Sequence, residues 1–86
     1  MLRADVLASL RCPETGTALT PVGEEVLRQV NAAIVAGRLR NRAGAKLAEQ
    51  LDEGLMRAEG DFIYPVIRRI PILLVDEAIP VDQVRN

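Results

Sequence analysis

The feature that most constrains this fold is the near absence of residues that can cross-link the chain. Its 86 residues include one cysteine, Cys12, and no histidine. A single cysteine excludes an internal disulfide, and a structural zinc site needs four ligands, usually thiolates or imidazoles. Chains near this length bury only about 60–65% of their unfolded surface and often depend on such cross-links. Apolar packing must therefore stabilise the fold, and with one Phe, one Tyr and no Trp the core has to be aliphatic.

The composition also narrows the classes of function. Histidine is the commonest general base and a frequent metal ligand, and the chain has none. Eleven basic and twelve acidic residues leave a net charge of −1, which gives no overall field favouring nucleic acid or an anionic membrane. We expect a protein that is not an enzyme, needs no cofactor and acts by binding a partner.

Two further features predict where the chain is found. The longest apolar run, residues 70–75, is far shorter than the roughly 20 residues needed to cross a bilayer. The N-terminal stretch contains Arg3 and Asp5 and is too short for the hydrophobic region of a secretory signal. We therefore predict a cytoplasmic setting without membrane contact.

The first part of the chain predicts a helix followed by a short strand. Apolar residues at helical spacing predict a helix over 2–10, which ends before Pro13 because the residue preceding a proline avoids the helical region. Residues 18–22 are predicted to form a short strand, and Pro21 confines it to an edge or an end of the sheet.

A helical insertion is predicted next. Over 24–37 the apolar residues fall on one helical face, the first turn is acidic, and Gly37 is a natural stop. Residues 41–51 are ambiguous: Asn41 can cap a second short helix, whereas Gly44 weakens the pattern. We take them as a short helix that extends the insertion to about residue 51.

The region from 55 to 75 is rich in β signals. The three predicted strands are 55–58, 61–67 and 71–75, with a turn at 59–61. The run 72–75 is continuously apolar, which predicts a strand covered on both faces. Residues 76–86 are polar and interrupted by proline, so we predict a tail. Together the elements predict one α+β domain over 1–86, with a small antiparallel sheet of three to four strands, an N-terminal helix and a helical insertion.

Residues 12–15, Cys-Pro-Glu-Thr, have the shape of half a zinc knuckle, C-P-x-C, with threonine at the second position. One thiol without any imidazole cannot complete such a site, so we predict no bound metal. Cys12 is predicted to be a small buried apolar residue at a helix end. The alternative is a reactive thiol whose pKa is lowered by the adjacent Arg11.

Charged residues offer a second candidate site. The basic cluster comprises Arg38, Arg40, Arg42 and Lys46. It is a candidate for contact with RNA phosphates, although both aromatic residues lie elsewhere and no stacking platform is evident. Each adjacent acidic pair, such as Asp52-Glu53, turns its two carboxylates apart and is predicted to be solvated surface.

The order of these motifs resembles a known family. A helix leads into C-P, a helical insertion follows, and residues 64–74 carry Y-P-(x)4-I-P-x-L-L. This is similar to the small zinc-ribbon-like activator subunit of tRNA, rRNA and release-factor methyltransferases, and to its short bacterial relatives. The resemblance covers nearly the whole chain. Its most specific part is the C-terminal motif.

The resemblance implies a degenerate zinc ribbon. The four ligand positions of the zinc-bearing members correspond to Cys12, Thr15, Arg57 and Gly60, so three of the four ligands are absent. Relatives also carry a glycine in the last hairpin turn, where this chain has Arg68-Arg69, so a type I′ turn is less favourable. The implied role is a non-catalytic module that docks on a methyltransferase holding the S-adenosylmethionine, and reaches RNA or a translation factor only through it.

An apolar strand with few charges beside it predicts where a partner binds. One face of the strand should pack on the N-terminal helix, and the other on the insertion helix or on a partner. The predicted partner-binding residues are Phe62, Tyr64, Ile70 and Ile72. The partner is a methyltransferase or a second copy of this chain, which adds a strand to the free sheet edge.

Overall fold

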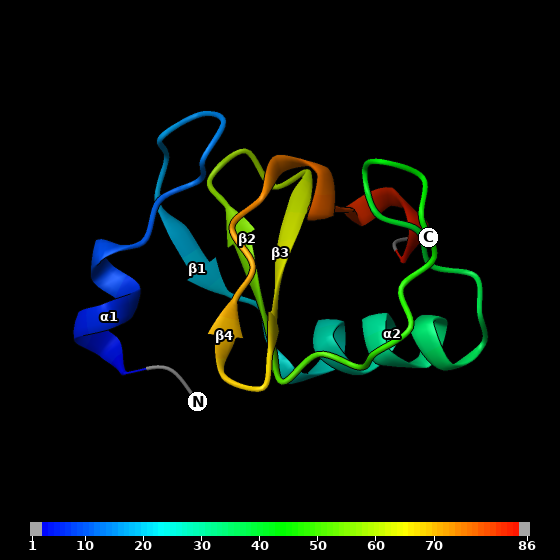
Figure 1. Cartoon of the computed structure of the whole chain (residues 1–86). Helices are drawn as coiled ribbons and strands as arrows, with labels where there is room; N and C mark the ends of the chain where they lie inside the picture. Colours follow the sequence, from blue (N-terminus) through cyan, green and yellow to red (C-terminus); the bar gives the residue numbers. More distant parts are fainter. Residues whose placement is uncertain (1–2, 85–86) are drawn as a thin grey trace.

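A computed structural model describes residues 3–84 and shows an α+β fold built on one antiparallel sheet (Figure 1). The helices are α1 (Ala4–Ser9) and α2 (Glu24–Val35), with short 3-10 helices at Val75–Glu77 and Val81–Gln83. The strands are β1 (Leu19–Pro21), β2 (Glu53–Arg57), β3 (Phe62–Ile67), β4 (Ile70–Pro71) and β5 (Ile79–Pro80). The strand order is β1-β2-β3-β4, and β5 pairs with β3 beside β4. The predicted α+β class with a small antiparallel sheet is confirmed, and β5 adds a strand to the expected sheet.

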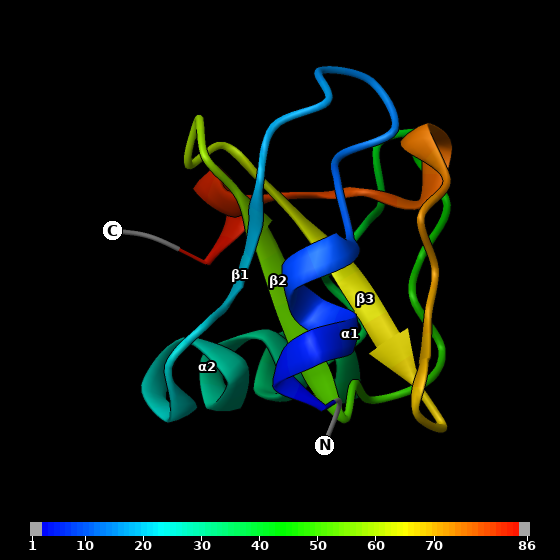
Figure 2. The same cartoon turned by 90° about the vertical axis from the view of Figure 1, so that its left-hand side faces the viewer.

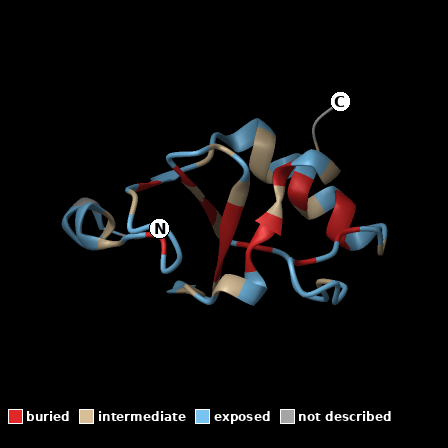
Figure 3. Ribbon diagram, turned by 90° about the horizontal axis from the view of Figure 1, so that it is seen from above, coloured by how far each residue is buried: buried red, intermediate tan, exposed pale blue. Residues whose placement is uncertain are grey.

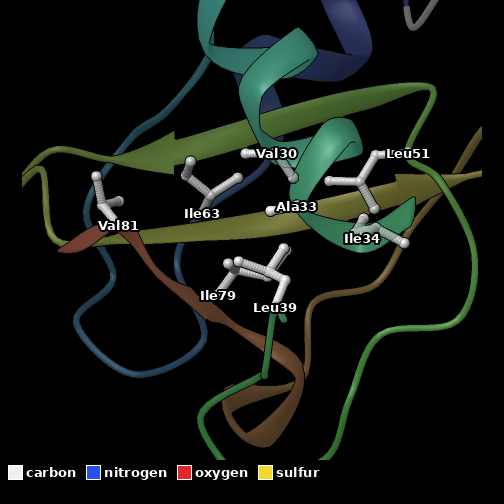
Figure 4. Packing of buried hydrophobic residues seen from close by; sticks show 8 residues of the cluster. All are labelled: Val30, Ala33, Ile34, Leu39, Leu51, Ile63, Ile79 and Val81. Atoms are coloured by element: carbon white, nitrogen blue, oxygen red, sulfur yellow. The ribbon is translucent and has the colours of Figure 1, made fainter. Parts of the chain in front are cut away.

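The sheet separates two packed clusters. Alternate residues of β3 point to opposite faces, so Ile63 lies in the cluster under α2 and Tyr64 in the cluster that α1 covers. Figure 4 shows the α2-side cluster, in which aliphatic side chains from the helix, the sheet and the loops meet. In Figure 2, α1 lies in front of the sheet, and Leu7 and Leu10 pack against the other cluster.

Helix α2 follows the predicted pattern. Its buried residues are Val30, Ala33 and Ile34, which share one face. Glu24 and Glu25 occupy the first turn, and Gly37 at φ +74° follows the last turn. The helix predicted over 24–37 is confirmed. The short strand predicted over 18–22 is also confirmed as β1, an edge strand that ends at Pro21.

The helix predicted over 41–51 is wrong. Asn41 is 8% exposed, and its side-chain oxygen accepts a hydrogen bond from the Ala45 N–H at 3.0 Å. The backbone N–H of Gly44 donates to the Asn41 carbonyl at 2.9 Å, with Gly44 at φ +90°. The asparagine therefore closes a local turn, and this local bonding competes with helix formation.

Two predictions about the C-terminal part are also wrong. The strand predicted over 71–75 is reduced to β4, because Pro65 in β3 has no N–H to donate and the ladder cannot continue past it. The predicted tail over 76–86 belongs to the core as far as the described residues reach. Ala78 and Ile79 are fully buried and Val81 is 3% exposed, and Ile79 pairs with Ile63 of β3.

The turn between β3 and β4 adopts a left-handed conformation that is unfavourable for its two arginines. Ile67 pairs with Ile70, which leaves a two-residue connection in which Arg68 has φ +52° and Arg69 φ +66°. Both residues lie in the left-handed region required by a type I′ turn. The Arg69 N–H donates to the Asp52 carboxylate at 2.8 Å, and Arg68 pairs with Glu49 at 2.6 Å, so contacts outside the hairpin hold the turn.

Candidate functional site

An uncovered apolar row follows the last hairpin. Ile70 is 61% exposed and Leu74 62% exposed, and Ile72 between them is half-buried. The intervening Leu73 packs into the α1-side cluster, so the row lies on the other side of an extended segment. Beside it is an open hollow of about 240 Å³ lined by Ile67, Ile70, Ile72, Glu49 and Arg68. We call Ile70, Ile72 and Leu74 the apolar row.

The structure divides the four predicted partner-binding residues. Ile70 and Ile72 lie on the apolar row. Tyr64 is fully buried, so it offers no contact surface. Phe62 is half-buried, with the Arg42 and Arg57 guanidinium groups over its ring, and it lines a separate open hollow with Pro80 and Val81. The expectation is corrected at Tyr64, because the α1-side cluster covers this residue of β3, and stays a prediction at Phe62. Leu74 was missed, although alternation from Ile70 places it on the same side.

Proline limits strand addition at every described sheet edge. The edge prolines are Pro21 in β1, Pro71 in β4 and Pro80 in β5. In each case the following residue donates its backbone N–H inward, to Gly54, Pro65 and Asp61 respectively. Because alternate residues of a strand point their backbone groups to opposite sides, each proline nitrogen faces outward. A partner strand would therefore meet a missing donor at each edge, which favours docking through side chains.

A buried arginine lies at the opposite end of the β2–β3 hairpin. The Arg57 side chain is 7% exposed and donates two parallel hydrogen bonds to the Asp61 carboxylate, at 2.6 and 2.8 Å. Its remaining nitrogen reaches Glu14 at 2.9 Å and the Cys12 sulfur at 3.7 Å. Hydrogen bonding to Asp61 raises the pKa of Arg57, and the same bond lowers the pKa of Asp61. Arg57 thus fastens the loop around residues 12–14 to the sheet.

Cys12 is a buried thiol with polar partners. It is 2% exposed, and its sulfur lies 3.1 Å from the Tyr64 hydroxyl. Burial raises the pKa of the thiol, but hydrogen bonds from Thr15, Tyr64 and Arg57 outweigh burial and lower this pKa to about 6. The predicted burial is confirmed. The prediction that Arg11 lowers this pKa was wrong, because Arg11 donates to the carbonyls of Ala8 and Leu10 instead.

The loop over 12–17 is held by further polar contacts. Arg42 pairs with Glu14 at 2.7 Å, and the Arg42 and Arg57 guanidinium carbons lie 4.6 and 4.8 Å from the centre of the Phe62 ring. Bonds from Arg42 and Arg57 lower the pKa of Glu14. Thr17 donates to Glu59 at 2.8 Å, so the loop is also joined to the turn after β2. Within residues 3–84, no three acidic or cysteine side chains are grouped to hold a metal ion.

The predicted basic cluster is largely engaged within the chain. Arg42 bonds to Glu14, Arg40 donates to the Gly44 carbonyl at 2.8 Å, and Arg38 lies 3.4 Å from the Gln83 carbonyl. Lys46 is exposed. Direct contact of these residues with RNA stays a prediction. No helix in the described part of the chain is long and apolar enough to span a bilayer.

Comparison with known proteins yields one informative likeness. No protein-family model and no curated protein matches the chain. Among solved structures, the chain is similar to XF2673 from Xylella fastidiosa, determined by NMR in solution, with 28% sequence identity and a TM-score of 0.74. The match covers 96% of this chain and 86% of that protein. The likeness therefore extends over nearly the whole of the fold.

Proposed function

We propose that this chain is a non-catalytic docking module that binds an S-adenosylmethionine-dependent methyltransferase acting on RNA or a translation factor, and stabilises or activates it. The observation that carries the proposal is the apolar row, where Ile70 and Leu74 are each more than 60% exposed on a domain with a small core. Apolar side chains gathered on one strip of a small domain mark a surface that something else covers. The mixed charge of Glu49 and Arg68 beside it provides a polar rim.

Contacts between distant motifs support the resemblance on which the enzyme class rests. Cys12 belongs to the C-P motif and Tyr64 to the Y-P motif, and their side chains meet at 3.1 Å. Arg57 and Thr15 occupy two of the positions that correspond to zinc ligands, and both hydrogen-bond to the Cys12 thiol. In this reading a guanidinium, bonded to a thiol and two carboxylates, links the segments that a metal would link in a zinc ribbon.

Affinity capture from the native cell tests the proposal. The bait is compared with a double variant, Ile70→Lys/Leu74→Lys, which places two cations on the apolar row. The matched control is Val35→Lys, because Val35 is 71% exposed at the last turn of α2, where a cation is favourable. We expect the wild type and Val35→Lys to retain a methyltransferase identified by mass spectrometry, and the double variant to lose it.

Two outcomes would overturn the proposal. If the double variant is folded by circular dichroism and retains the same methyltransferase, the row is not the docking surface. If the protein lost by the double variant is not a methyltransferase, the class of partner is wrong. The captured enzyme is then assayed with and without added chain, and methyl transfer or solubility should rise only with the wild type and Val35→Lys.

A further inference from the structure

The open hollow that Phe62 lines is built by the pairing of β3 with β5. Its volume is about 450 Å³, and its lining residues are Gly60, Asp61, Phe62, Pro80, Val81 and Asp82. Phe62 is opposite Pro80 in the ladder, and the Val81 N–H donates to the Asp61 carbonyl at 3.0 Å. Phe62 begins β3, whereas the apolar row starts beside Ile67 at the other end of the strand (Figure 2). At about 3.3 Å per residue these two ends are roughly 17 Å apart, and the hollow and the row share no residue.

The lining of this Phe62 hollow combines apolar side chains with carboxylates and contains no cation. Phe62, Pro80 and Val81 provide the apolar surface, and Asp61 and Asp82 provide negative charge. Asp82 is exposed, and among residues 3–84 its carboxylate has no hydrogen-bond or ion-pair partner. An apolar lining with a few polar groups is typical of binding sites, and here the polar groups favour a cationic ligand.

The charges next to the hollow are also negative in sum. The ion-pair network beside Phe62 consists of Arg42, Arg57, Glu14, Glu59 and Asp61. With Asp82, two positive charges stand against four negative ones, which leaves a sum of −2. An incoming cation therefore meets a surplus of negative charge, although two guanidinium groups are already present.

The same ring shows which kind of cation fits. Arg57 bonds to the Asp61 carboxylate while its guanidinium carbon lies 4.8 Å from the centre of the Phe62 ring. A planar and weakly hydrated guanidinium suits an aromatic ring beside a carboxylate better than a compact ammonium does. Asp82 lines the hollow together with this ring, and no arginine within residues 3–84 bonds to it. The hollow therefore repeats the pairing of ring and carboxylate, with the carboxylate free.

We propose that the Phe62 hollow binds an arginine side chain of a partner protein, with the guanidinium at Asp82 and the methylene groups on Phe62 and Pro80. The hollow is open, so it cannot enclose a free small cation as ligand pockets usually do. A side chain carried by a bound protein is instead held at a high local concentration and gains further contacts around the rim. The inference does not rest on the proposed function, because it uses none of the residues of the apolar row.

Titration of the isolated, isotope-labelled chain with short capped peptides, followed by NMR, tests the inference. The peptide Gly-Arg-Gly should bind with a Kd on the order of 10 mM and shift the amides of Gly60, Asp61 and Asp82 in a saturable way, while the Ile70 amide on the apolar row stays unchanged. Gly-citrulline-Gly has nearly the same shape without the charge, and Gly-Lys-Gly keeps the charge without the planar group. Each should bind at least about threefold more weakly.

Two variants of the chain test the role of the free carboxylate. Asp82→Asn should weaken binding of the arginine peptide about threefold or more, and Asp82→Lys should abolish it. The matched control is Asp76→Asn, because Asp76 and Asp82 are both exposed and each is the second residue of a 3-10 helix. This control should bind the peptide as the wild type does.

Several results would overturn the proposal. One is the absence of a saturable shift at about 50 mM arginine peptide, and another is equal binding of the citrulline or lysine peptide. Wild-type affinity in a folded Asp82→Asn variant, or an equal loss in Asp76→Asn, would contradict it as well. The peptide series needs no variant, so it decides if a substitution prevents folding.

Discussion

The two faces of the sheet are packed by different means. The α2-side cluster is aliphatic and includes Ile63 at 0% exposure, whereas the α1-side cluster contains a thiol, a phenol and a neighbouring buried arginine. Figure 3 shows buried residues along the central strands and on α2, while residues 5–9 of α1 are exposed or half-buried. The six-residue α1 covers less apolar surface than the twelve-residue α2. Polar contacts centred on Arg57 stabilise the α1 face of the sheet, which the short helix covers incompletely.

The largest expected effect lies on the aliphatic face. Ile63→Ala removes a fully buried side chain at the centre of β3 and leaves a cavity, so the free energy of unfolding should fall by about 3–4 kcal/mol. Urea denaturation measures this. Ile70→Ala, at a residue that is 61% exposed, should cost well under about 1 kcal/mol. Equal losses from the two variants would contradict the assignment of Ile63 to a closed core.

The polar face depends on one cation, and removing it is the second test. Arg57→Met should lower the free energy of unfolding by about 2–3 kcal/mol, because the Cys12 thiol and Glu14 each lose a bond and Asp61 loses its guanidinium partner. The loss is smaller than for a fully buried pair, since Glu14 and Asp61 are 36% and 50% exposed and can be hydrated. Arg38→Met, at an exposed arginine with a 3.4 Å contact, is the control and should change stability little. A stable Arg57→Met variant would show that α1 packing alone suffices on this face.

The same face should make stability depend on pH. The pKa of the Cys12 thiol is about 6 in the folded chain and 9.0 ordinarily, so between these values only the unfolded chain holds the proton. The free energy of unfolding should therefore rise by about 1 kcal/mol or more from pH 6 to pH 9, and this gain is lost as pH falls through 6. Burial raises the pKa of Tyr64, so stability should decline again above about pH 10.

Thermal denaturation over pH 6–10 checks this dependence, with Cys12→Ser as the matched variant. The serine cannot ionise in this range, so its stability should be flat between pH 6 and pH 9. We also expect Cys12→Ser to cost about 1 kcal/mol at neutral pH and to leave partner binding intact. A wild-type curve as flat as that of the variant would show that the thiol stays protonated in the folded chain.

The smallest expected effect concerns the turn that carries the apolar row. Arg69 at φ +66° is strained by about 1 kcal/mol relative to glycine, and part of this is offset by the greater freedom of glycine when unfolded. Arg69→Gly should therefore stabilise the domain by about 0.5 kcal/mol. Gly60→Ala is the converse control: Gly60 has φ +77° and open space around the added carbon, so only backbone strain should destabilise it. Destabilisation by Arg69→Gly would show that the arginine side chain itself holds the turn.

The sequence predicted well what depends on neighbours along the chain. The amphipathic pattern of α2, the β2–β3 hairpin with its turn at Gly60, and the edge position of Pro21 all follow from local signals. The helix prediction for residues 41–51 failed because the Asn41 side chain accepts from the Ala45 N–H and closes a turn. Composition does not show which partner an asparagine side chain takes. The tail prediction failed because acidic residues flank the short apolar stretch 78–81, in which Ile79 pairs with a strand residue sixteen positions earlier.

The polar contacts around Arg57 could not be predicted from the sequence for a different reason. Arg57 contacts Cys12 across 45 positions and Glu14 across 43, and no periodicity records such a separation. A weak signal was present, since Arg57 follows Leu55 by two residues in a strand and so shares its buried face. On the apolar row, alternation supported Ile70 and Ile72 and should also have indicated Leu74. The sequence did not show that both faces of β3 are buried, and it is this burial that prevents Tyr64 from contacting a partner.

Titration calorimetry tests the central claim, that the apolar row carries partner binding, most directly. The methyltransferase retained by affinity capture is titrated with the wild type, with Ile70→Lys/Leu74→Lys and with Val35→Lys, each shown to be folded. We predict that the double variant binds at least about 30-fold more weakly than the wild type, as expected when central apolar contacts are lost, and that Val35→Lys binds equally well. Equal affinities for the wild type and the double variant, or an equal loss with Val35→Lys, would contradict the account.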